Sequence, residues 1–493
     1  MNRRHSDFQA HDRIGSTSDA ADSVSGNTAA EGILESVPPD RPRLGGRTES
    51  EVRRDLCSSA TDGAGFSLMV GLTETYFAAL FVTVGLSDFA VGMMVTLPYL
   101  LGSLLQLTTP WGVTRLKSFR HWVVWNAGLQ SLSLFGLAAA VFWGWIQFSV
   151  LLVLVSIYFA AGLATAPVWN TWIERLIPKP VRAQFLSRRM RICQVCLMSG
   201  IVVAGYVLWL ASDEAARRHV FTVLLLAGGI ARFVSTWMLY RQSERPQWLE
   251  GLTELPALTA EDREGLAASR LVIPYCAAMQ FAIFCAGPYF TPFMLRVMEL
   301  PYWQFTLLIM LGYLGRIVTL TWAGNAARYF GQGTLLWMGG VGIIPAAGLW
   351  IFYESIWFLY VVQFVAGAAW ACYELGMMLV FVERIPQSRR VVMLSWYNAI
   401  NGLAMVLGSL LGGWLISSWS GESAGFLLVF VLSTGLRLAA LVFFPYALFR
   451  RSGSGTGPLY MFYPAPDPNS RTLLRPFYAF GDKPRNSREP QAD

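Results

Sequence analysis

Long apolar segments alternate with short polar segments along most of this chain. A helix that crosses a bilayer needs about 20 mostly apolar residues, and twelve segments have about that length. They are residues 66–85, 90–110, 121–142, 146–168, 192–211, 220–240, 271–295, 303–323, 334–352, 356–381, 392–417 and 424–447. The pattern therefore predicts an all-α membrane protein with twelve transmembrane helices.

Longer polar stretches divide these spans into domains. Residues 1–64 are rich in Ser, Asp, Gly, Arg and Pro, a composition typical of disordered segments. Residues 450–493 form a second polar tail, and residues 242–270 are the longest polar break between the spans. We therefore predict six-helix bundles at 65–241 and 271–449, with a central loop at 242–270.

Basic residues concentrate in alternate loops. They are Arg115, Lys117 and Arg120 after the second span, Arg175, Lys179, Arg182, Arg188, Arg189 and Arg191 after the fourth, Arg241, Arg245, Arg263 and Arg270 after the sixth, Arg328 after the eighth, and Arg384, Arg389 and Arg390 after the tenth. Such loops face the cytoplasm. We expect a multi-pass protein of the bacterial inner (plasma) membrane with both tails cytoplasmic; Arg217 and Arg218 are exceptions to the alternation.

Composition narrows the class of function. Only 14% of the residues are charged, against about 25% in soluble proteins. The net charge of +7 comes from basic residues at the ends of apolar runs, so nucleic acid is not an expected partner. The sequence contains no Walker loop, zinc cluster or nucleophile elbow. We expect no enzyme activity, no cofactor and no metal site.

Two short matches relate the halves to each other. Glu174-Arg175-Leu176-Ile177-Pro178 follows the fourth span, and Glu383-Arg384-Ile385-Pro386 follows the tenth. The sixth span contains Gly229 and Arg232 where the twelfth contains Gly435 and Arg437. Equivalent placement indicates duplicated six-helix units.

Two loops contain a pattern of glycine and basic residues. The loop between helices eight and nine reads Gly324-Asn-Ala-Ala-Arg328-Tyr-Phe-Gly331, and the loop between helices two and three reads Gly112-Val-Thr-Arg115-Leu-Lys117-Ser-Phe-Arg120. In these loops the chain resembles the major facilitator superfamily. Both lack the family's Asp. The resemblance implies two pseudo-symmetric six-helix bundles around a central solute site. It makes Gly112, Arg115, Gly324, Arg328 and Gly331 candidates for gating.

Two acids fall inside predicted spans. A charged group near the centre of a span costs about 2.5–3.5 kcal/mol on insertion scales. In the resembled fold Glu74 and Glu374 lie on cavity-lining helices, at similar predicted depth from the cytoplasmic side. A carboxyl held away from water binds a proton more readily. The pair is therefore a candidate for proton coupling or cation recognition; interhelical hydrogen bonding is the alternative.

Further residues complete the candidate site. We expect an ion pair between Arg316 and Glu374. Asn170, Gln280, Tyr289 and Phe290 also fall on presumed cavity helices and are candidates for solute contact, with packing or interhelical hydrogen bonds as the alternative. Arg232 and Arg437 fall on helices that usually face lipid, so we expect their side chains to snorkel to the headgroups.

These observations favour transmembrane transport by alternating access. The cavity helices look apolar and aromatic, which favours a small, amphipathic organic solute, with the proton as the coupling ion. The alternative is a non-transporting sensor or scaffold that retains the fold. We expect a monomer whose partners are the solute and the lipid bilayer.

Overall fold

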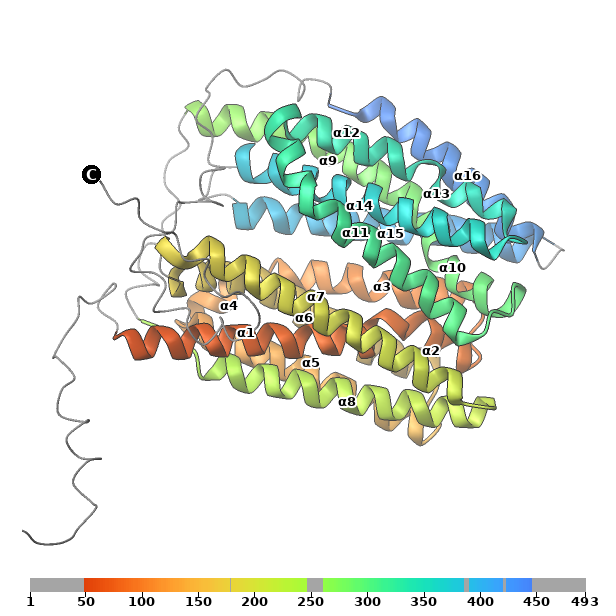
Figure 1. The fold of residues 1–493 in the computed structure, drawn as a ribbon, viewed down its shortest axis with the longest axis horizontal. Coiled ribbons are helices and arrows are strands. Elements are labelled where there is room, and N and C mark those ends of the chain that lie inside the picture. Colours follow the sequence, from red (N-terminus) through yellow and green to blue (C-terminus); the bar gives the residue numbers. More distant parts are fainter. Residues whose placement is uncertain (1–47, 178, 246–259, 385–389, 420–422, 446–493) are drawn as a thin grey trace, which may run out of the picture. The chain divides into compact units, whose positions relative to one another are not determined.

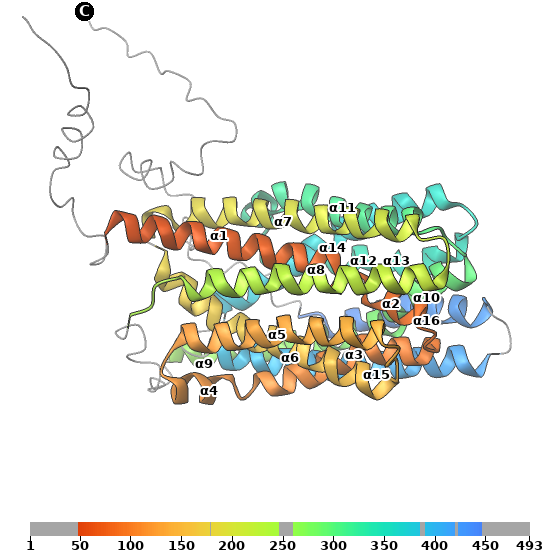
Figure 2. The ribbon, with the colours of Figure 1, turned by 90° about the horizontal axis from the view of Figure 1, so that it is seen from below.

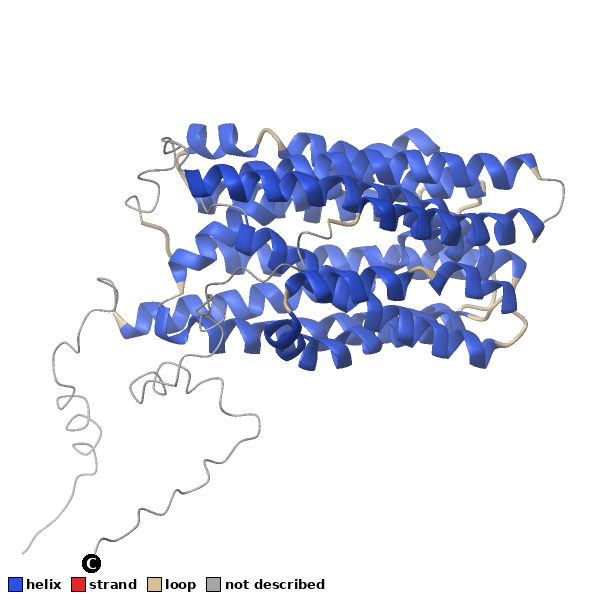
Figure 3. Cartoon of the chain, turned by 90° about the horizontal axis from the view of Figure 1, so that it is seen from above, coloured by secondary structure: helices blue, strands red, loops and turns tan. Residues whose placement is uncertain are grey.

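The structure, a computed structural model, describes residues 48–177, 179–245, 260–384, 390–419 and 423–445. Every regular element in these ranges is helical (Figure 3). Twelve helices or helix groups within them are long and apolar enough to cross a membrane. The prediction of an all-α, twelve-span protein is confirmed.

The described part of the N-terminal half contains eight helices and one 3-10 turn. They are α1 (Glu49–Leu72), η1 (Glu74–Tyr76), α2 (Phe77–Thr83), α3 (Asp88–Gln106), α4 (Thr109–Leu116), α5 (Phe119–Phe142), α6 (Phe148–Leu176), α7 (Lys179–Leu210) and α8 (Glu214–Tyr240).

The C-terminal half is interrupted more often. Its elements are α9 (Ala260–Ala286), η3 (Gly287–Tyr289), α10 (Phe290–Pro292), η4 (Phe293–Val297), α11 (Tyr302–Phe330), α12 (Gln332–Ile343), α13 (Pro345–Gly348), η5 (Leu349–Phe352), α14 (Ile356–Arg384), α15 (Arg390–Ser418), α16 (Ala424–Ala440) and η6 (Leu441–Phe443). The breaks at Pro288 and Pro292 in the seventh span follow from the missing backbone donors of proline.

The two halves repeat one packing scheme. In the N-terminal half α1 packs on α7 and α8, and α6 packs on α3 and α5. In the C-terminal half α9 packs on α15 and α16, and α14 packs on α11 and α12. The halves contact each other through α3 with α15 and through α7 with α11. Figures 1 and 2 show the helices of both halves running along one common direction.

The bundle has two ends that differ in charge. The end at which α1 begins is called the basic end, because Arg115, Lys117, Arg120 and Arg241 lie there, beside α4 and the end of α8 (Figure 1). The other end, where α2 leads into α3, is called the opposite end. The α1–α2 span thus runs from the basic end to the opposite end.

Helix α1 begins earlier than the sequence pattern predicts. It starts at Glu49 rather than near residue 65, with Thr48 as its N-cap. Val52 and Leu56 are fully buried in a cluster with Phe185. The polar residues of this stretch are buried among other residues of the protein and are not solvated by water. Hydropathy alone does not reveal this. The predicted N-tail of 1–64 is therefore too long.

The central loop is likewise shorter than predicted. Helix α9 already begins at Ala260. Residues 242–245 are bound to the N-terminal half: Gln242 is fully buried, and Glu244 accepts hydrogen bonds from the backbone N–H groups of Phe119 and Arg120 at the start of α5. The predicted loop of 242–270 thus includes helix at its end and an anchored segment at its start.

Candidate functional site

Glu74 lies at a break in the first span. The hydroxyl groups of Thr73 and Thr75 donate to the backbone oxygens of Met69 and Val70, at 2.8 and 3.0 Å. Such bonds compete with the regular helical pattern, and the chain turns from α1 through η1 into α2 at this point. Glu74 is thus presented from an irregular turn.

The partner of Glu74 is a buried tyrosine. The hydroxyl of Tyr158, from α6, donates to Oε2 of Glu74 at 2.7 Å. Tyr158 is 1% exposed and packs edge-on against Phe77 and Phe159. A single hydrogen bond from α6 therefore fixes one carboxylate oxygen of Glu74.

Arg316 and Glu374 form the predicted ion pair. Arg316 lies on α11 and Glu374 on α14, and a guanidinium nitrogen of Arg316 contacts Oε2 of Glu374. Their side chains are 32% and 44% exposed. The pair is thus formed yet remains accessible, as a group that meets a solute must be.

Tyr313 lies beside Arg316 and close to Thr75 of the other half. It lies three residues before Arg316 on α11, and the guanidinium carbon of Arg316 is 6.0 Å from the centre of its ring. Its hydroxyl lies close to Thr75 and within electrostatic reach of both Glu74 and Glu374. Tyr313 was not among the predicted site residues; its signal in the sequence is its place one helical turn from a charged residue inside a span.

The two acids do not lie at the same depth. Glu74 lies nine residues before the end of its span at Thr83, on the side of the opposite end. Glu374 lies seven residues before the end of its span at Phe381, on the side of the basic end. The expectation of matching depth was wrong because α1 begins at Glu49, well before the apolar run from which depth was counted.

The other residues predicted to contact the solute lie apart from Glu74, Tyr313 and the Arg316–Glu374 pair. Asn170 is exposed on α6, and Gln280 lies in α9 with its Oε1 buried and unpartnered among the described residues. Tyr289 is fully buried and donates to the backbone oxygen of Ser409 at 2.6 Å. Phe290 stacks on Phe430 with ring centres 4.6 Å apart. This placement of Tyr289 and Phe290 favours the packing alternative.

The first candidate gating loop, which contains Gly112 and Arg115, lies at the basic end. A Cβ on Gly112 would meet the ring of Trp122 at 2.0 Å, so α4 and α5 are in close contact there. Arg115 is exposed and lies 5.7 Å from the ring centre of Trp111. Next to this loop, the Glu244 carboxylate accepts hydrogen bonds from the Ser118 hydroxyl and from the backbone N–H of Phe119 at the start of α5.

The structure describes the second candidate gating loop only in part. Gly331 joins α11 to α12 at φ +83°, a conformation that favours glycine. The side chains around Gly324 and Arg328 lie outside the described residues.

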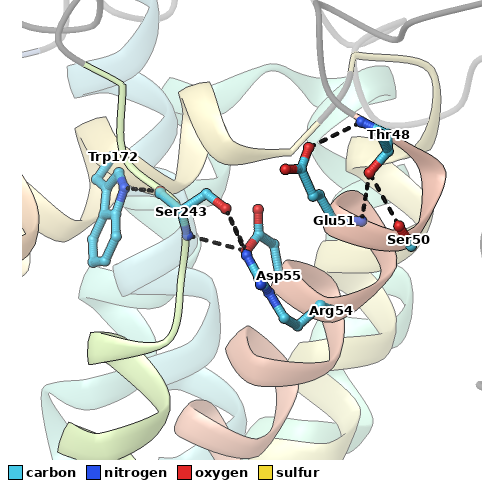
Figure 4. Close-up of polar contacts among 7 residues, drawn as sticks. All are labelled: Thr48, Ser50, Glu51, Arg54, Asp55, Trp172 and Ser243. Atoms are coloured by element: carbon cyan, nitrogen blue, oxygen red, sulfur yellow. Dashed lines mark hydrogen bonds and ion pairs between the residues drawn. The ribbon is translucent and has the colours of Figure 1, made fainter.

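A set of polar contacts closes the basic end of the N-terminal half (Figure 4). Asp55 of α1 accepts from the backbone N–H and the hydroxyl of Ser243, both at 3.0 Å. Trp172 of α6 donates from Nε1 to the backbone oxygen of Ser243 at 3.1 Å. The start of α1, the end of α6 and the segment after α8 are therefore held together.

The expectation that Arg232 and Arg437 snorkel to lipid was wrong. Arg232 is 3% exposed and Arg437 is 4% exposed. Arg232 donates to Gln130, and Arg437 donates to the backbone oxygen of Ile343 at 2.7 Å. Each side chain turns into its own half, where it donates a hydrogen bond to a neighbouring helix.

Several polar contacts between the halves lie toward the opposite end, while Asn398 of α15 donates to Gln106 of α3 at 3.0 Å nearer the basic end. Arg296 of η4 forms an ion pair with Asp88 at the start of α3. The hydroxyls of Tyr76 and Thr306 are 3.0 Å apart, and those of Thr83 and Tyr302 are 3.1 Å apart. A pocket of about 370 Å³ remains beside them, lined by Glu214, Arg217 and Glu299 among others.

No protein-family model matches the chain, and no curated protein matches it. Solved structures match over most of its length. The nucleoside transporter NupG is 14% identical, with a TM-score of 0.57 over 79% of this chain and 99% of its own. A D-xylose-proton symporter is 15% identical, with a TM-score of 0.58 over 80% of this chain and 96% of its own.

One protein in two states gives a further comparison. A bacterial homologue of the iron transporter ferroportin is 15% identical and covers 82% of this chain and all of its own. Its inward-facing state gives a TM-score of 0.58, and its outward-facing state gives 0.51. The described residues thus contain twelve candidate membrane spans, arranged in the fold of these solved transporters.

Proposed function

We propose that this protein moves a small organic solute across the membrane by alternating access between its two halves. The observation that supports this most is the polar row formed by Glu74, Tyr313, Arg316 and Glu374. Its members come from both halves and lie within the spans. Charged groups at such depth usually face a cavity or a partner and serve function.

The arrangement of contacts fits one state of such a cycle. The halves are joined toward the opposite end by Asp88 with Arg296 and by Tyr76 with Thr306. If the basic end faces the cytoplasm, as the loop charges predict, this is an inward-facing state. We place the protein in a bacterial inner membrane with both tails in the cytoplasm.

We assign proton coupling to Glu74. Its carboxyl lies inside the span with one hydrogen-bond donor, Tyr158. Burial favours the protonated form of a carboxyl, while a donated hydrogen bond favours the charged form. The opposing effects let the group gain and lose a proton as the surroundings change between states.

We assign solute contact to the Arg316–Glu374 pair. The pair is accessible, and Tyr313 adds a ring and a hydroxyl beside it. A charged pair next to an aromatic ring suits a polar organic molecule with an apolar part. Proteins that share the fold are described as a nucleoside transporter, a D-xylose-proton symporter and a homologue of an iron transporter, so the fold leaves the solute open.

Uptake into proteoliposomes tests this proposal. The purified protein is reconstituted, and the flux of amines, sugars, nucleosides and amphipathic drugs is measured with and without a pH gradient. We expect accumulation of at least one class, driven by the gradient and lost in Glu74→Gln. Gradient-driven accumulation that survives this substitution would remove Glu74 from coupling. No flux across the panel would favour the sensor or scaffold alternative.

A further inference from the structure

A series of buried polar side chains lies inside the N-terminal half. It starts at Tyr158, the hydrogen-bond donor to Glu74. Besides donating to Glu74, the Tyr158 hydroxyl is within hydrogen-bonding reach of the side-chain amide of Gln130 on α5. Gln130 is 2% exposed. Its Oε1 accepts from Nε of Arg232 on α8 at 2.8 Å.

The chain continues from Arg232 toward the basic end. Arg232 donates to the hydroxyl of Ser235 at 2.8 Å, and Ser235 donates to Oδ1 of Asp62 on α1 at 2.7 Å. The other oxygen of Asp62 pairs with Arg189 of α7 at 3.2 Å. We call Tyr158, Gln130, Arg232, Ser235, Asp62 and Arg189 the Arg232 network; each member is at most 9% exposed.

The charges in this network do not balance by themselves. Arg232 and Arg189 are permanently charged guanidinium groups, whereas Asp62 is the one carboxylate among the six. Arg232 bonds directly to two neutral groups, Gln130 and Ser235. An uncompensated charge away from water is costly. The network is neutral only when ionised Glu74 is counted with it.

Other groups near Glu74 do not alter this balance. Tyr313 of α11 faces Glu74 from the second half and is neutral in its usual form. Arg316 and Glu374 lie beyond Tyr313 and compensate each other. Glu74 is thus the carboxylate that Tyr158 joins to the network by a hydrogen bond.

We propose that Arg232 and Gln130 are positioning residues for Glu74, and that the Arg232 network is electrically balanced by the Glu74 charge through Tyr158. The proposal rests on the proposed role of Glu74 in coupling. A proton on Glu74 leaves one excess positive charge among α1, α5, α7 and α8. Proton binding thereby changes the forces inside the whole N-terminal half and not only at the cavity.

A charge-rescue cycle on the full-length protein in detergent tests this. Thermal unfolding is measured at alkaline pH for the wild type, Glu74→Gln, Gln130→Glu and the double variant. Gln130→Glu places a carboxylate beside Arg232 while keeping an acceptor. We expect it to lower the melting temperature by several degrees in the wild-type background and to raise it in the Glu74→Gln background, because only the double variant restores neutrality.

A second cycle covers the case in which Gln130→Glu fails to fold. Arg232→Gln alone leaves a negative excess, and we expect Glu74→Gln to raise the melting temperature in that background. Ser131→Ala is the matched control. Ser131 donates to the backbone oxygen of Gly229, so the substitution removes a neutral hydrogen bond between the same two helices, α5 and α8. Its effect should be the same in the wild-type and Glu74→Gln backgrounds.

Additive melting temperatures in both cycles would overturn the proposal. The measurement needs no solute and no flux, so an absence of transport would count against the proposed function alone. Conversely, additive cycles together with gradient-driven uptake would leave Glu74 as the coupling residue and remove the Arg232 network from that role.

Discussion

Tyr158 and Glu74 are the residue pair on which coupling depends in this proposal. One hydroxyl fixes one carboxylate oxygen at 2.7 Å, and a hydrogen bond to a charged group contributes about 1.5–3 kcal/mol. We expect Tyr158→Phe to lower gradient-driven uptake about tenfold, because the phenyl ring keeps its packing while the donor is lost. The measurement is initial uptake rate in proteoliposomes.

Tyr99→Phe is the control for that substitution. Tyr99 also places its ring against Phe159, with centres 6.3 Å apart, and it lies outside the Arg232 network. Its uptake should stay near the wild-type rate. Equal losses in both variants would mean that Tyr158 acts through packing alone.

The two charges of the Arg316–Glu374 pair can be exchanged by substitution. Each single reversal, Arg316→Glu or Glu374→Arg, places two like charges together inside the spans. We expect each to abolish most uptake and the double reversal to recover a large part of it, as measured by solute flux. A double variant no better than the singles would show that the contact between these side chains does not matter for transport.

Much of the site could be predicted from sequence, for a physical reason. A charge inside an apolar run is conspicuous, so Glu74, Arg316 and Glu374 were predicted, and their ion pair was confirmed. Neutral polar residues within spans are not conspicuous, and Tyr313 was missed. The sequence of a helix also does not determine which way its side chains point. Arg232 and Arg437 turn inward because their hydrogen-bond partners, Gln130 and the Ile343 carbonyl, lie on other helices.

At the scale of the elements, close packing of helices from the two halves requires small residues. Tyr289 of η3 lies between α3 and α15, where a Cβ on Gly92 would come within 2.3 Å of its hydroxyl oxygen. We expect Gly92→Ala to separate α3 from η3 and to destabilise the closed opposite end. Hydrogen–deuterium exchange should then be faster over η4 and the start of α11, since local opening exposes backbone amides.

Gly128→Ala is the matched control, because a Cβ there meets only Thr236 at 3.9 Å, an ordinary contact. Unchanged exchange in Gly92→Ala would mean that the close approach is absorbed without opening.

The boundary of the first span could not be predicted from hydropathy. The pattern placed the start of the first helix at residue 66, but residues that are buried against α6 and α7 extend it to Glu49.

At the scale of the whole molecule, the joined opposite end defines the state. Asp88 and Arg296 connect α3 of one half to η4 of the other. We expect Asp88→Asn to shift the population toward the state open at this end, because the closed state alone contains the ion pair. Faster exchange of amides in residues 293–302, measured at equal temperature and pH, would report the shift.

Glu299→Gln serves as the control, since Glu299 lines the pocket at the same end and is not the partner of Arg296 in the described contacts. The same exchange rates in Asp88→Asn and in the wild type would mean that the aromatic and hydroxyl contacts suffice to keep this end closed. The twofold plan of the molecule was readable from the weak repeat; which end is joined was not, because closure depends on contacts between distant spans.

The anchoring of residues 242–245 to the N-terminal half has a consequence for assembly. Ser243 and Glu244 fix where the connection between the halves departs, and α9 begins at Ala260, fifteen residues after Arg245. A chain of that length spans at most about 50 Å, so the covalent connection sets only an upper limit on the distance between its two ends. The two halves should therefore assemble as separately synthesised fragments, provided that the break lies after Arg245 and the first fragment retains its own anchor.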